Sequence, residues 1–115
     1  KVVLGEADGT ETLVFDEVDA GVGGSTAVAL AQVLARLARS HQVIVVTHLA
    51  QVAVMAERHY LVSKSEGALP QTTIRPIEGE ERVVEVARML SGDASEASLA
   101  HARQMLEAAA AGRAR

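Results

Sequence analysis

The chain has no cysteine and no tryptophan, and aromatic side chains make up only 2% of its 115 residues. Without cysteine it forms neither disulfides nor thiolate metal sites, which agrees with a reducing cytoplasm. No apolar run approaches the roughly 20 residues that a membrane-spanning helix needs. These absences exclude a disulfide-stabilised scaffold, a thiolate zinc site and a helical membrane span.

Positive charge is also scarce, because the formal net charge at pH 7 is −4. Such a segment lacks the basic footprint of a nucleic-acid-binding surface, so DNA contacts of a parent protein are expected mostly elsewhere. Hydrophobic residues make up 49% of the chain, but much of this is alanine, which buries little area. The composition predicts one small, incomplete domain over residues 1–115, with a thin core that is completed against another chain segment.

A short apolar run at residues 12–15 and an apolar, β-branched run at residues 42–46 are typical of buried parallel strands. Apolar residues at helical spacing from Ser25 to about Arg39 lie between them, with Ser25 as a candidate N-cap. Strand, helix and strand in this order predict a parallel βαβ unit and an α/β fold class.

The second half of the chain changes character. We expect a short helix, an antiparallel strand pair and two C-terminal helices, the last beginning with a capping box formed by Asp93 and Glu96. The ends of the sequence indicate the close of a helix, then a polar loop, and finally a frayed tail. The short helix is expected over residues 49–57, the two strands over 59–64 and 71–77, and the two C-terminal helices over 80–90 and from 96 onward. The helix end is expected over residues 1–5, the polar loop over 5–11 and the frayed tail over 108–115.

Asp16 and Glu17 follow the first predicted strand directly. A buried strand holds its last carboxylate in place, where it can bind Mg²⁺, usually through a water molecule. The next residue points the opposite way and can activate the water that attacks a γ-phosphate. This order is the Walker B arrangement, and it predicts Asp16 as the metal ligand and Glu17 as the general base. An ordinary strand that ends in an acidic turn is the alternative.

Thr47 and His48 close the second predicted strand. In a parallel sheet this strand end lies at the same edge as Asp16 and Glu17, where ligands bind in open α/β sheets. A histidine there can hydrogen-bond a γ-phosphate. Alone, such a histidine is more often a cap or a surface residue, but two strand ends in the correct chain order favour a nucleotide site.

The sequence contains no G-x-x-x-x-G-K-S/T loop for cradling phosphates. Its one glycine-rich loop, Gly21-Val-Gly-Gly24, leaves a dinucleotide-binding turn as an alternative, but the third glycine of that fingerprint is missing. Without the phosphate-binding loop, the chain alone is expected neither to bind ATP tightly nor to hydrolyse it. The remaining histidines show no ligand spacing and are expected at the surface; they are His41, His59 and His101.

Five segments resemble the head domain of the ABC and SMC-like ATPases and, within that group, the RecN family of bacterial DNA repair proteins. They are residues 15–24, 45–53, 62–64, 82–92 and 98–103. They cover nearly the whole chain in the family's order. The resemblance implies the C-terminal half of a P-loop ATPase head built from the two ends of one long chain. The Walker A loop, the signature loop and the coiled coil then lie outside this sequence, and residues 1–5 end the helix after the signature loop.

Carried over residue by residue, the resemblance makes Asp16 the Mg²⁺ aspartate, Glu17 the catalytic base and His48 the switch histidine. The D-loop then spans residues 19–23, where Gly23 replaces the usual aspartate and the nucleotide interface includes Asp19, Gly21 and Gly23. The implied cofactors are ATP and Mg²⁺. The implied partners are the N-terminal half of the same head, a second head in an ATP-sandwiched homodimer, and DNA through the full-length protein. The implied location is the bacterial cytoplasm, on the nucleoid during repair, with no membrane partner.

Two further readings stay open. Another SMC-like head or a transporter cassette would share the strand ends, although transporter cassettes usually carry a proline where this chain has Val18. The second alternative is a non-enzymatic, alanine-rich interaction module whose acidic strand end is accidental. Nucleotide binding by the reassembled head separates these classes.

Overall fold

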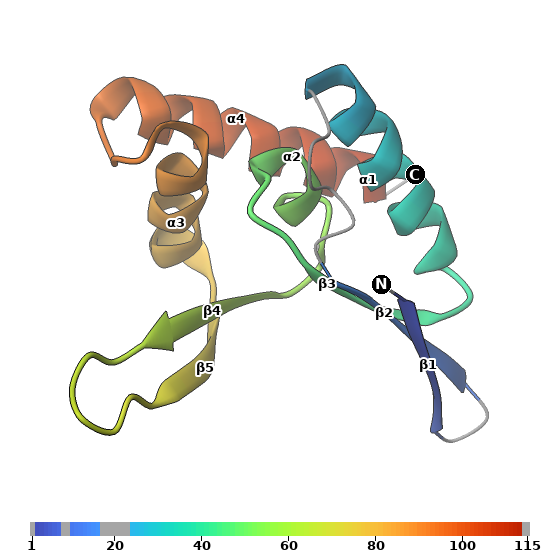
Figure 1. The fold of residues 1–115 in the computed structure, drawn as a ribbon. Helices are drawn as coiled ribbons and strands as arrows, with labels where there is room; N and C mark the ends of the chain where they lie inside the picture. The colour runs from blue at the N-terminus through green and yellow to red at the C-terminus, as the bar shows by residue number, and fades with distance from the viewer. Residues whose placement is uncertain (1, 8–9, 17–23, 114–115) are drawn as a thin grey trace.

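The computed structural model describes residues 2–7, 10–16 and 24–113. Two consecutive strands open the described chain, helices and strands then alternate as far as a second strand pair, and two helices follow (Figure 1). In chain order the elements are β1 (Val2–Ala7), β2 (Thr10–Asp16), α1 (Gly24–Leu37), β3 (Gln42–Val46), α2 (Ala50–Ala53), β4 (His59–Lys64), β5 (Thr72–Ile77), α3 (Gly79–Ser91) and α4 (Glu96–Arg113).

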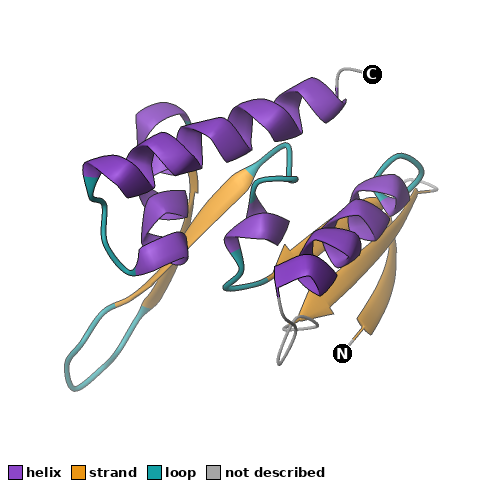
Figure 2. Cartoon of the chain, turned by 90° about the horizontal axis from the view of Figure 1, so that it is seen from above, coloured by secondary structure: helices purple, strands orange, loops and turns teal. Residues whose placement is uncertain are grey.

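The first sheet has the strand order β1-β2-β3, in which β1 is antiparallel and β3 parallel to β2. Helix α1 connects the parallel pair and lies over one face of the sheet (Figure 2). Its Ala31 and Leu34 are buried, and Phe15 and Val45 from the two strands pack against them. The predicted parallel βαβ core is therefore present.

A second, two-stranded sheet is formed by β4 and β5, which pair antiparallel and extend away from the helices (Figure 1). Helices α3 and α4 follow and share a core with α2, centred on the fully buried Val86 and on Ala87 and Ala102. The predicted α/β class, with an antiparallel strand pair and two C-terminal helices after the βαβ core, is confirmed. This is the arrangement expected of the C-terminal half of an ABC/SMC-type ATPase head.

The start of the chain differs from its prediction as a helix end followed by a polar loop. Residues 2–7 form strand β1, which pairs with β2 along its whole length, from Val2 opposite Phe15 to Ala7 opposite Thr10. Pairing with a neighbouring strand satisfies the backbone groups of this segment, and it overrides the local pattern.

Three predictions at helix ends were also wrong. Helix α1 begins at Gly24, so Ser25 lies inside it. Helix α4 is capped by Ser95, whose Oγ accepts the N–H of Ser98 at 3.3 Å, while Asp93 accepts the N–H of Ser95. The helix continues to Arg113 and buries Ala109, because that residue packs into the α2–α3–α4 core. Among the described helices, none is both long and apolar enough to cross a membrane.

Candidate functional site

Strands β2 and β3 end side by side. Their last paired residues are Asp16 and Val46, which are partners in the parallel register. Because Thr47 and His48 follow Val46 directly, the acidic end of β2 and the Thr-His end of β3 meet at one edge of the sheet. Asp16 and His48 are both exposed there. The predicted meeting of the two strand ends is confirmed.

The chain turns sharply after β3. The Oγ1 atom of Thr47 accepts the N–H of Leu49 at 3.0 Å, and the carbonyl of Leu49 accepts the N–H groups of Val52 and Ala53. Helix α2 then begins at Ala50, which is buried. His48 is therefore held between a strand and a short helix, with its side chain toward solvent.

The other predicted site residues, Glu17, Asp19, Gly21 and Gly23, lie outside the described residues. Within the described ranges, no group of three or more His, Asp or Glu side chains is arranged to hold a metal ion. Of the sequence-predicted site residues, Asp16 is the candidate ligand that lies within the described part of the chain. One exposed carboxylate at a rigid strand end fits Mg²⁺, which keeps several of its waters and is commonly bound through one or two carboxylates together with phosphate oxygens.

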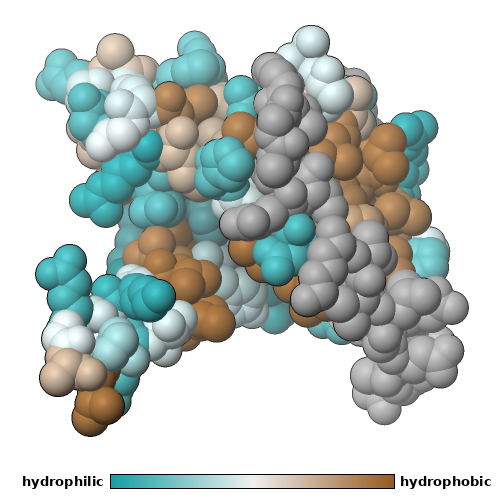
Figure 3. Space-filling view, in the orientation of Figure 1, coloured by the Kyte–Doolittle hydropathy of each residue, from teal (hydrophilic) through white to brown (hydrophobic). Residues whose placement is uncertain are grey.

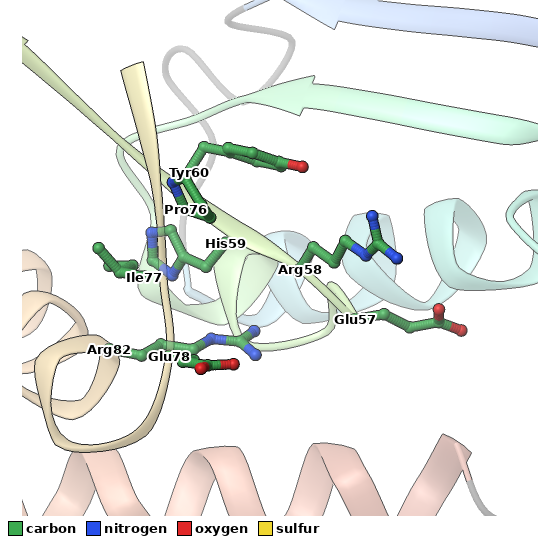
Figure 4. A pocket seen from close by; sticks show the side chains of 8 residues that line it. All are labelled: Glu57, Arg58, His59, Tyr60, Pro76, Ile77, Glu78 and Arg82. Carbon is green, nitrogen blue, oxygen red and sulfur yellow. The ribbon is translucent and has the colours of Figure 1, made fainter. Parts of the chain in front are cut away.

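A separate hollow of about 470 Å³ lies where the hairpin meets α3 (Figure 4). Neither Asp16 nor His48 lines it; the lining residues are Glu57, Arg58, His59, Tyr60, Pro76, Ile77, Glu78 and Arg82. Charges of both signs surround it, and the side chains of Glu57 and Arg58 extend away from the ring of His59 (Figure 4).

The three histidines that were expected at the surface differ from one another. His101 is exposed, whereas His41 is half-buried and its Nδ1 lies 2.8 Å from Ser40 Oγ. His59 is also half-buried, and its Nδ1 has no hydrogen-bond partner. Burial, followed by the positive charge of Arg82, lowers the pKa of His59 below its ordinary value. The surface prediction is confirmed for His101 only, because strand β4 carries His59 toward α3 and the ring of His41 lies against the end of α1, with Nδ1 3.2 Å from the carbonyl oxygen of Leu37.

Arg82 is a residue that the sequence reasoning missed. Its Nη2 donates to the carbonyls of Ala53 and Ala56, at 3.2 and 2.7 Å, at the end of α2. The acceptors are backbone oxygens 29 and 26 residues away along the chain. Backbone acceptors leave no residue-type pattern, so nothing in the sequence signals the contact.

No protein-family model matches the chain. Its sequence is 52% identical over 115 residues to the DNA repair protein RecN of Streptomyces coelicolor, covering 98% of this chain and 20% of that protein. It is 54% identical over 98 residues to RecN of Deinococcus radiodurans, covering 84% of this chain and 17% of that protein. With RecN of Treponema pallidum it shares 48% identity over 112 residues, covering 96% and 20%. The chain therefore belongs to the RecN family, and it spans about one fifth of the length of these relatives.

Proposed function

We propose that this chain is the segment of an ATP-binding and ATP-hydrolysing head that supplies the Walker B carboxylates, the D-loop and the switch histidine. The parent protein is an SMC-like protein of DNA double-strand-break repair and recombination. The observation that carries the proposal is the parallel register that pairs Asp16 with Val46, because it brings an acidic strand end beside the strand end that leads into His48. The names of the relatives, DNA repair protein RecN, support the repair role.

Each site residue has a distinct task. Asp16, exposed at the end of β2, holds Mg²⁺ through a water molecule. When bound, Mg²⁺ neutralises charge on the phosphate oxygens. Glu17 is the base that takes the proton of the attacking water, and His48 donates a hydrogen bond to the terminal phosphate. Asp19, Gly21 and Gly23 belong to the D-loop at the interface with a second head, and at Gly23 no side chain is available for a carboxylate contact.

The uncovered face of the first sheet supports the proposal that another chain segment completes this head. On the face opposite α1, Ile44 and Val46 are 46% and 49% exposed, and Val14 pairs with Ile44. Within the described residues, Ile44 and Val46 therefore leave apolar surface open on this face. We propose that the N-terminal half of the same head covers it and brings the phosphate-binding loop, and that two completed heads sandwich ATP. With a net charge of −4 on this segment, DNA contacts belong mostly to other parts of the protein.

Substitutions in the full-length protein test the assignment by their order of effects. Glu17→Gln removes the base but keeps the shape, so turnover should fall by about 10²- to 10⁴-fold while Mg²⁺-ATP still binds and head dimers accumulate. Asp16→Asn weakens the metal site and should reduce nucleotide-dependent dimerisation itself. His48→Ala should lower turnover with smaller effects on binding.

ATPase assays, nucleotide-binding titrations and sedimentation velocity measure these three effects. Glu107→Gln, at an exposed position of α4, is the matched control and should behave as wild type. If Glu17→Gln abolished ATP binding, or left hydrolysis unchanged, the Walker B assignment would be withdrawn. Absence of Mg²⁺-ATP binding by the full-length protein would favour the interaction-module reading.

A further inference from the structure

A side chain from another element binds the C-terminal end of helix α2. The carbonyl of Ala53 already accepts the N–H of Ala56 at 3.2 Å, but a carbonyl oxygen can accept a second hydrogen bond. A cation at that end is favourable because carbonyl oxygens carry partial negative charge. Arg82 of α3 meets this need, since its Nη2 donates to both Ala53 and Ala56. Figure 4 shows the Arg82 side chain extending from α3.

Helix α2 is also the joint between the two cores of the described chain. Its Ala50, and Val54 directly after its last residue, pack with Val86 in the α2–α3–α4 core. Its Val52 packs with Ala31 and Leu34 in the core beneath α1. The helix begins two residues after His48, and the Thr47–Leu49 hydrogen bond makes that connection tight. A shift of α2 is therefore transmitted to His48 over very few bonds.

We propose that Arg82 is a positioning residue for His48. By holding the carbonyls of Ala53 and Ala56 it fixes α2 against α3, and α2 in turn fixes the backbone on which His48 stands. This inference rests on the proposed function, in which His48 meets the terminal phosphate of ATP. Arg82 acts only through the backbone of residues 47–56.

Hydrogen exchange in the full-length protein tests the hold on α2 without reference to catalysis. Arg82→Met keeps the aliphatic stem and removes the donors, so amides of residues 49–56 should exchange about tenfold faster or more, while those of α4 keep their wild-type rates. The matched control is Arg88→Met on the same helix, because the Arg88 side chain is 60% exposed and forms its salt bridge with Glu85, one turn away. Unchanged exchange in residues 49–56, or an equal rise in α4, would overturn the proposal.

A double-mutant cycle tests the connection to His48. Arg82→Met should lower kcat by up to about 100-fold with little change in KM for ATP. In the His48→Ala background the same substitution should cause no further loss, and Arg82→Lys should recover part of the activity. If the fold losses in kcat of Arg82→Met and His48→Ala multiplied in the double variant, Arg82 would not act through His48. Full turnover by His48→Ala would contradict the proposed function instead, and exchange would still report on the Arg82 contact by itself.

Discussion

His59 illustrates how burial decides the charge of a single residue. It lies at the start of β4, half-buried, with Arg82 nearby. Both the loss of solvent and the charge of Arg82 disfavour the imidazolium form, so its pKa in the folded state is below the ordinary value of 6.5. The unfolded chain therefore binds a proton at a higher pH than the folded chain does. Stability from this group is fully present above pH 6.5 and is lost as the pH falls through 6.5 toward the folded-state pKa.

Replacing this residue should flatten the acid side of the stability profile. For wild type, the free energy of unfolding should fall between pH 7 and pH 5, and His59→Gln should show a smaller decline because the group that titrates is gone. Urea unfolding at both pH values, at one fixed low protein concentration, measures the difference. His101→Gln leaves His59 in place and should keep the wild-type decline. Equal declines for wild type and His59→Gln would contradict the burial argument.

At the scale of an element, the end of α3 depends on the backbone of Gly92. This residue is in the left-handed region with φ of 80°, and its N–H bonds to the carbonyl of Arg88 at 2.7 Å. A Cβ atom at Gly92 would meet nothing within 4 Å. Any cost of a side chain there is thus a cost of the backbone conformation alone.

Gly92→Ala should lower the free energy of unfolding by about 1 kcal/mol, because only glycine adopts this conformation without strain. Gly112→Ala, near the end of α4 and equally free of neighbours within 4 Å, should be neutral or stabilising by less than about 1 kcal/mol. Chemical denaturation of both variants beside wild type gives the comparison. Equal changes in the free energy of unfolding, in the same direction, for the two substitutions would contradict a special role of the left-handed backbone at Gly92.

At the scale of the whole molecule, apolar surface remains open on both sheets. The face of the first sheet opposite α1 carries Ile44 and Val46, and on the hairpin Val62 and Ile74 are 59% and 67% exposed. The space-filling view shows apolar patches on the hairpin arm that are separated by hydrophilic surface (Figure 3). Exposed apolar patches mark an interaction site, or association of the chain with itself.

The isolated 115-residue chain should therefore self-associate. Ile44→Ser with Val46→Ser should raise the dissociation constant at least about tenfold, since each loses roughly 1 kcal/mol of apolar burial in the associated form. Sedimentation velocity over a range of concentrations measures it. Val33→Ser changes a residue of matching exposure, 45%, on α1, and should leave association unchanged. A monodisperse wild-type monomer that melts cooperatively would contradict the expectation.

The sequence predicted an element correctly where a local residue pattern is itself the cause of the structure. Strands β3 and β4 have the predicted bounds, since short runs of β-branched, aromatic and other apolar residues bordered by polar residues favour extended backbone. Strand β1 was missed because it depends on pairing with β2, which no local pattern reports. The acidic and Thr-His strand ends were found because side chains carry that chemistry, whereas the Arg82 contact to α2 uses backbone oxygens and was not.

The βαβ order and the meeting of Asp16 with the Thr47–His48 strand end follow from residue patterns along the chain, because a parallel connection leaves few ways to arrange two neighbouring strands. Tertiary packing sets which sheet face α1 covers, leaving Ile44 and Val46 open. It alone also decided that α2 joins two cores and ends on Arg82. These features depend on packing between segments far apart in the chain, where distance and direction matter more than residue type.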